Sequence, residues 1–113
     1  MNTNIKIELQ NDTLQISFNT SDTKGFIEFA DDIRTYLKQK IKIIKIDLSK
    51  EDTIDSLIVG KMIKMIKISR EFEKEIIFKV STQVEKIIKL TSLDNIISYE
   101  IENNELNNTN SYK

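Results

Sequence analysis

The chain has 113 residues, the length of one domain, and it contains neither cysteine nor histidine, which excludes disulfides, thiolate chemistry and the commonest general base and metal ligand. A formal net charge of -1 is unlike that of a dedicated nucleic-acid binder. No apolar run approaches the roughly 18 residues of a membrane span, and no basic and apolar leader follows Met1. We therefore expect a cytoplasmic protein that binds no nucleic acid and does not insert into a membrane.

Alternating apolar and polar residues mark the first two strands. Residues 5–9 and 14–18 alternate with period two on either side of the turn-forming segment 10–13. This pattern predicts a hairpin of two half-buried strands. After a polar segment, apolar residues recur at three- and four-residue steps from Phe26 to Leu37, which predicts one amphipathic helix.

Strand and helix patterns then alternate to residue 101. We expect strands over 42–48, 75–80 and 97–101, a helix over 56–70, and another helix that Ser81 or Thr82 caps. Such repeats favour parallel pairing with right-handed crossovers. The expected fold is therefore α/β: one domain over 1–102, in which an N-terminal hairpin feeds a mixed, mostly parallel sheet of about four or five strands with helices packed on it. Residues 103–113 are too polar to offset the entropy of ordering and should form a disordered tail.

The predicted helix over 56–70 opens on Asp55-Ser56, where a phosphate on the serine would be favoured. The first turn of a helix has unpaired N–H groups and carries the positive end of the macrodipole. Ser56 could instead serve only as an N-cap or first-turn residue. Asp55 could cap the helix, orient the serine hydroxyl, or contact a basic partner. The chain has no glycine-rich phosphate loop, and no calcium-loop spacing surrounds its paired carboxylates, so we expect no cofactor and no metal.

Two segments resemble STAS domains, and more narrowly the bacterial anti-sigma-factor antagonists. Ile43-Ile44-Lys45-Ile46-Asp47-Leu48-Ser49, followed by Thr53-Ile54-Asp55-Ser56 and Gly60, is similar to the family's strand ending in Asp-Leu-Ser before a phosphorylatable Asp-Ser. Leu90-Thr91-Ser92-Leu93-Asp94 is similar to the family's Leu-Thr-Gly-Leu-Asp close before the last strand. In this order and spacing the two matches cover most of residues 5–101.

The resemblance implies a non-enzymatic regulatory switch with a STAS-like fold. Such a protein, when unphosphorylated, binds a serine protein kinase that acts as an anti-sigma factor. Phosphorylation, here of Ser56, releases it, and a serine phosphatase resets it. We expect a monomer or weak homodimer whose partner-binding residues are Asp55, Ser56, Leu57, Gly60, Lys61, Ser21, Asp22 and Thr23. Capping by Ser21 or Asp22 is an equally good explanation of the last three positions.

An alternative is a STAS-like scaffold, or a subunit of a transporter or signalling assembly, that is never phosphorylated. Leu57 and Ile58 favour it, because they place bulk where the family has a small hydroxyl residue and a glycine. Gly60 keeps the later small position, which we attribute to close packing of helix on sheet.

The predicted helix also carries a row of three lysines, Lys61, Lys64 and Lys67. This row is either a solvated face or attracts an acidic partner. An enzyme using Asp55 and Ser56 ranks below both, since no base accompanies the serine.

Truncation after Glu102 should leave the melting temperature within a few degrees of that of the full chain, because the apolar periodicity stops at Ile101. Thermal unfolding of both proteins, followed by circular dichroism, checks this. Loss of cooperative unfolding in the shorter chain would show that the tail packs on the domain.

Overall fold

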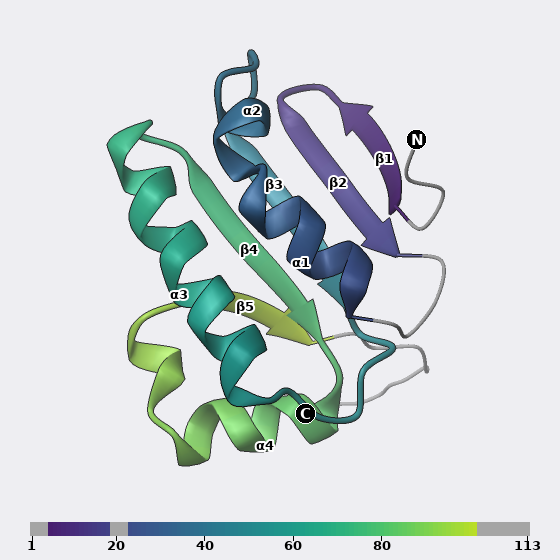
Figure 1. Cartoon of the computed structure of the whole chain (residues 1–113), viewed down its shortest axis with the longest axis vertical. Coiled ribbons are helices and arrows are strands. Elements are labelled where there is room, and N and C mark those ends of the chain that lie inside the picture. Colours follow the sequence, from purple (N-terminus) through teal and green to yellow (C-terminus); the bar gives the residue numbers. More distant parts are fainter. Residues whose placement is uncertain (1–4, 19–22, 102–113) are drawn as a thin grey trace, which may run out of the picture.

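The computed structural model describes residues 5–18 and 23–101, which form a five-stranded sheet and its helices (Figure 1). The strands are β1 (Ile5–Gln10), β2 (Thr13–Phe18), β3 (Ile43–Leu48), β4 (Glu75–Val80) and β5 (Ser98–Ile101). The helices are α1 (Lys24–Asp31), α2 (Ile33–Leu37), α3 (Ser56–Glu71), α4 (Thr82–Leu90) and the short 3₁₀ helix η1 (Leu93–Asn95). The strands lie in sequence order, with β1 and β2 antiparallel and the other neighbours parallel. The expected fold class is confirmed.

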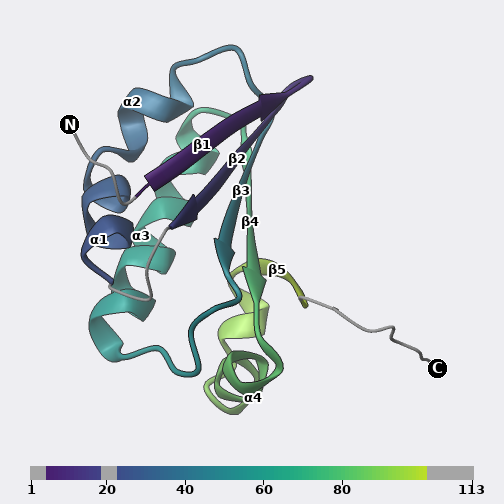
Figure 2. The same cartoon turned by 90° about the vertical axis from the view of Figure 1, so that its right-hand side faces the viewer.

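The helices α1, α2 and α3 cover one face of the sheet, as the edge-on view in Figure 2 shows. Alternate residues of β2, β3 and β4 point into this layer, where Ile44, Ile46 and Phe78 have no exposed surface. Burying side chains of this kind contributes about 1.5–3 kcal/mol each. From α3, Met62 and Met65 complete the same core.

The opposite face of the sheet carries no helix in the described ranges, and we call it the open face (Figure 2). Along β2 to β5 this face carries half-buried polar side chains, which include Gln15, Ser17, Lys45, Asp47, Lys79 and Glu100, whereas the side chains of β1 on it are exposed. Lys45 and Glu100 form an ion pair across this face at 3.2 Å. The sheet therefore has one apolar and one mainly polar side, on which Ile43 and Ile77 are half-buried apolar residues.

The predicted helix from Phe26 to Leu37 is two helices, so that prediction was wrong in its continuity. Asp32, with φ -100° and ψ 15°, interrupts the helix, and the chain restarts as the N–H of Thr35 donates to the carbonyl of Asp32 at 2.9 Å. Phe29 before the break and Ile33 after it are both 1% exposed. Periodicity could not reveal the break, because the apolar pattern continues through it.

The first strand is also less buried than predicted. A two-residue turn, with Asn11 at φ 58°, joins β1 to β2, but β1 lies at the edge of the sheet. Every residue of β1 after Ile5 is exposed, whereas β2 alternates between buried and half-buried. The helices that cover β2 reach its neighbour only at Ile5, so most of β1 is exposed and only one strand of the hairpin is half-buried along its length.

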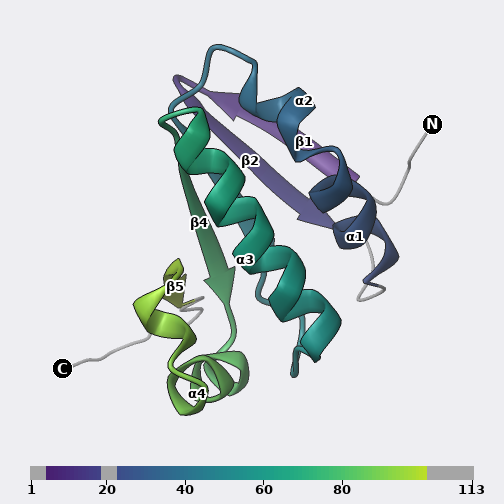
Figure 3. The same cartoon turned by 60° about the vertical axis from the view of Figure 1, so that its left-hand side comes forward.

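The fourth helix packs apart from the other three, beyond the end of β4 (Figure 3). Ser81 is its N-cap and accepts a hydrogen bond from the N–H of Val84 at 3.2 Å, which confirms one of the two predicted caps. Val84 and Ile88 are fully buried, and the hydroxyl of Tyr99 in β5 donates to Glu85 at 3.2 Å. No helix within the described ranges is long and apolar enough to cross a membrane. The predicted tail over 103–113 lies outside those ranges.

Ser92→Gly should raise the free energy of unfolding by about 1 kcal/mol, because Ser92 adopts a left-handed conformation that costs an L-residue about 1–2 kcal/mol and glycine much less. Its φ is 60° and its ψ is 20°, at the position where the resembling motif has glycine. Urea denaturation measures the change, with Ser92→Ala as the matched control that keeps the Cβ. Equal stability of the two variants would show that the backbone conformation carries no cost here.

Candidate functional site

The segment from 49 to 55 connects the carboxyl end of β3 to the start of α3, at the lower end of the molecule in Figure 1. Parallel α/β sheets place their binding loops at this edge, because the βα connections leave from it. Ser56 is the first residue of α3. The predicted phosphoacceptor therefore lies where the fold presents loops to other molecules.

Hydrogen bonds and one buried side chain hold this loop in place. Asp47 accepts bonds from the backbone N–H of Ser49 at 2.9 Å and from its hydroxyl at 2.5 Å. Farther along, the hydroxyl of Ser81 donates to the carbonyl of Glu51 at 2.7 Å, which ties the loop to the start of α4. Ile54 is 8% exposed and belongs to the core. The approach to α3 is thus fixed before any partner binds.

Asp55 caps α3, as the first of its three predicted roles required. Its backbone is extended, with φ -100° and ψ 178°, and its carboxylate accepts the N–H of Ile58 at 2.9 Å. The carbonyl of Asp55 accepts the N–H of Val59 at 3.0 Å. A cap of this type contributes about 1 kcal/mol to helix stability. Ser56 is therefore not the cap, and its exposed hydroxyl makes no hydrogen bond to any other described residue.

The surface around Ser56 is formed by one exposed side of α3. Leu57 is 53% exposed, and Gly60, one turn after Ser56, is exposed as well. Ile58, in contrast, is 4% exposed and points into the core. Our expectation that both apolar residues add bulk beside the serine was wrong for Ile58, because a helix turns neighbouring side chains about 100° apart. Leu57 alone provides bulk at the site.

Gly60 is not required by packing, which corrects the reason given for it above. A Cβ at this position would meet no atom within 4 Å. Since glycine inside a helix costs about 1 kcal/mol relative to alanine, the described contacts give no structural ground for it.

The three lysines of α3 do not form one row. Lys61 is 21% exposed, and its Nζ lies 2.6 Å from a carboxylate oxygen of Asp31 in α1. Lys64 and Lys67 are exposed. Only the latter two share the solvated side of α3 with Gly60, and Lys61 instead joins α3 to α1.

Thr23 lies across a small pocket from the β3–α3 loop. The pocket has a cavity volume of about 20 Å³, and Thr23, Phe26, Glu51, Thr53 and Ile54 are among its lining residues. Room for about one water molecule is far below the 300 Å³ or more of a small-molecule site. Thr23 precedes α1 and makes no side-chain capping bond, while Ser21 and Asp22 lie outside the described residues. The structure thus brings Thr23 to the loop that leads into Ser56.

Within the described ranges, no group of three or more acidic side chains is placed to hold a metal ion.

The residues that sequence reasoning missed are those that fix the loop between β3 and α3. The bond between Asp47 and Ser49 could have been predicted from the sequence, because an Asp side chain commonly accepts a hydrogen bond from the backbone N–H of the residue two positions later. Nothing in the sequence signals the bond between Ser81 and Glu51, which are 30 residues apart.

Comparison with known proteins gives a likeness of fold. No family model matches the chain, and no curated protein matches it by sequence. Among solved structures, RsbS of Moorella thermoacetica, carrying a serine-to-glutamate substitution, is similar with a TM-score of 0.68 and 12% identity, over 88% of each chain. The NMR structure of the protein TM1081 is similar with a TM-score of 0.65 and 19% identity, over 84% of this chain and 78% of that one. The chain therefore has the STAS-like fold that its two sequence motifs predicted.

Proposed function

We propose that this protein is a partner-switching regulator of the anti-sigma-factor-antagonist type. Unphosphorylated, it binds a serine protein kinase that acts as an anti-sigma factor; phosphorylation of Ser56 releases it, and a serine phosphatase resets it. The observation that carries the proposal is the exposed hydroxyl of Ser56 at the first position of α3, immediately after the capping Asp55. The STAS-like fold and the resemblance of the Asp-Leu-Ser and Asp-Ser segments support it.

The charge of a phosphate explains how modification would act on a partner. A phosphoserine adds about -1.5 to -2 charges and three acceptor oxygens. At Ser56 these would lie at the positive end of α3, so the cost to the fold is small. Because Asp55 already accepts the N–H of Ile58, the phosphate would share this end with a carboxylate. The added negative charge would therefore act mainly on a bound surface that accommodates a neutral hydroxyl.

The exposed side of α3 provides the rest of the proposed contact. Leu57 offers an apolar side chain, Gly60 offers bare backbone, and Lys64, about two helical turns beyond the serine, offers a positive charge. Thr23 adds a polar group from the neighbouring loop. Interfaces of this kind place a few apolar anchors within a polar rim. A partner covering Leu57 and Gly60 would come within reach of the Ser56 hydroxyl.

A second candidate function is a scaffold that binds its partner permanently and is never phosphorylated. The observation that favours it is the exposure of Leu57, 53%, at a position where the resembling proteins have a small hydroxyl residue. A leucine beside the acceptor restricts access of a kinase, whereas a permanent partner would cover it. The two functions differ in whether charge at Ser56 changes binding.

The variants Ser56→Ala and Ser56→Asp should differ in their affinity for the serine kinase. The alanine variant keeps the site neutral and should retain the serine kinase, while the aspartate variant adds one negative charge and should bind it at least a hundredfold more weakly, a difference of about 3 kcal/mol. Each protein is used to capture the kinase from extracts of its native cell. Calorimetry with the purified kinase then measures both dissociation constants.

The matched control is Ser98→Asp, which makes the same chemical change at an exposed serine on β5, away from α3. It should bind as the unsubstituted protein does. Backbone amide NMR spectra of the three variants should agree outside the residues near each substitution, which shows that the fold is intact. Equal affinity of Ser56→Ala and Ser56→Asp would reject the switch and leave the scaffold.

A further inference from the structure

The outer edge of β1 has no strand beside it in the described part of the chain. In the sheet, β1 pairs with β2 alone (Figures 1 and 2). On its helix-facing side, Ile7 is 45% exposed and Leu9 is 61% exposed. Exposed edge strands with apolar side chains are templates for pairing with another chain, and native proteins usually shield them. This edge is therefore a candidate contact surface.

The register of the hairpin determines which backbone groups face outward. Gln10 and Thr13 flank the two-residue turn, and such a closing pair exchanges N–H···O bonds. Because hydrogen-bonded pairs alternate along an antiparallel ladder, Glu8 and Lys6 also bond toward β2. The N–H and C=O groups of Ile5, Ile7 and Leu9 consequently point outward and are available to an added strand.

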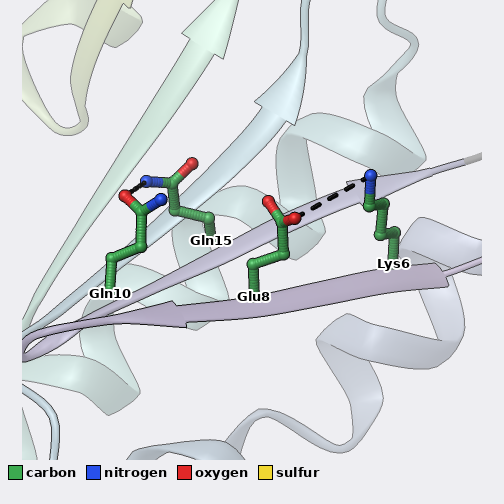
Figure 4. A network of polar contacts seen from close by, with 4 residues as sticks. All are labelled: Lys6, Glu8, Gln10 and Gln15. Atoms are coloured by element: carbon green, nitrogen blue, oxygen red, sulfur yellow. Dashed lines mark hydrogen bonds and ion pairs between the residues drawn. The ribbon is translucent and has the colours of Figure 1, made fainter.

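The charges of β1 lie on the open face, as Figure 4 shows. Lys6 and Glu8 are 3.9 Å apart, with 63% and 55% of their side chains exposed, so they are largely solvated. Farther along, Gln15 of β2 donates to Gln10 at 2.8 Å. The strand Ile-Lys-Ile-Glu-Leu is therefore self-complementary in an antiparallel pair. Its two ends are apolar, Ile7 lies at its centre, and the opposite charges of Lys6 and Glu8 lie at equal distances on either side of Ile7.

We propose that β1 pairs antiparallel with β1 of a second copy, about a two-fold axis at Ile7. In this register Lys6 faces Glu8 of the partner subunit and Glu8 faces Lys6 of the partner subunit. Both pairs are non-hydrogen-bonded positions, where side chains approach most closely. Shifting the axis to residue 6 or 8 would set Lys6 against its own copy or Glu8 against its own copy. The charges thus select the central register, in which a continuous ten-strand sheet would form from two five-strand sheets.

The same register covers the exposed apolar side chains. Ile7 meets Ile7 of the partner subunit, and Leu9 of the partner subunit lies opposite Ile5. Ile5 borders a hollow that Phe29 and Tyr36 also line, with their rings 4.6 Å apart between centroids. Leu9 of the partner subunit would occupy this hollow. Figure 1 shows α1 and α2 between β1 and α3, so the surface around Ser56 stays accessible in the dimer.

Sedimentation equilibrium over a concentration series, at low salt, tests the pairing. Unsubstituted protein should form a dimer. Lys6→Glu makes both facing pairs negative, and Glu8→Lys makes both facing pairs positive. Each substitution should therefore raise the dissociation constant of the dimer about tenfold or more. An equimolar mixture of these two variants should form a heterodimer, because every facing pair is then opposite in charge. The double variant Lys6→Glu/Glu8→Lys should dimerise as the unsubstituted protein does.

Lys67→Glu on α3 is the control and should leave the dimer unchanged, since Lys67 is exposed and lies away from β1. Circular dichroism verifies that each variant is folded. A monomer at every concentration for the unsubstituted protein would overturn the proposal. So would a dimer that both single variants retain, or a mixture that fails to associate.

Discussion

The fold depends on a sheet that is covered by helices on one face only. β2, β3 and β4 point alternate side chains into the layer beneath α1, α2 and α3, and the core residues Ile44, Met62 and Phe78 have no exposed surface. This arrangement determines both surfaces discussed above. It places the start of α3 at the carboxyl edge of the sheet, and it leaves β1 beyond Ile5 uncovered by the helices, with its outer edge unshielded by any described residue. The positions of the candidate site and of the proposed dimer contact thus both follow from the way α1, α2 and α3 cover the sheet.

A fixed loop and a free hydroxyl make the α3 terminus suitable for a charge switch. The bond from Ser81 to Glu51 and the burial of Ile54 hold the loop, and Asp55 holds the first turn. None of these contacts uses the Ser56 hydroxyl. Phosphorylation there would therefore change the surface charge without removing an interaction that stabilises the fold. A switch of this kind needs only a difference in partner affinity between two charge states.

Local patterns in the sequence predicted most of the fold, because the strands alternate and α3 and α4 have clear caps at Asp55 and Ser81. The break at Asp32 was not predictable, since the apolar period runs through it. The exposure of β1 depends on how far the helices reach over the sheet, which no local pattern encodes. At the site, the positions of Asp55 and Ser56 on α3 followed from capping preference. The ion pair that removes Lys61 from the exposed row depends on Asp31, 30 residues away.

The most direct test of the switch is the mass of the protein recovered from its native cell, followed by mapping of the modified peptide. We predict a form that carries one phosphate, on Ser56. Two other hydroxyls are less available, since Ser49 bonds to Asp47 and Ser69, which lies near the other end of α3, is buried and donates to the carbonyl of Ile66. Thr53 is exposed and is the sharpest competitor. A phosphate found only on Thr53, or no modified form under any growth condition that activates the kinase, would contradict the account.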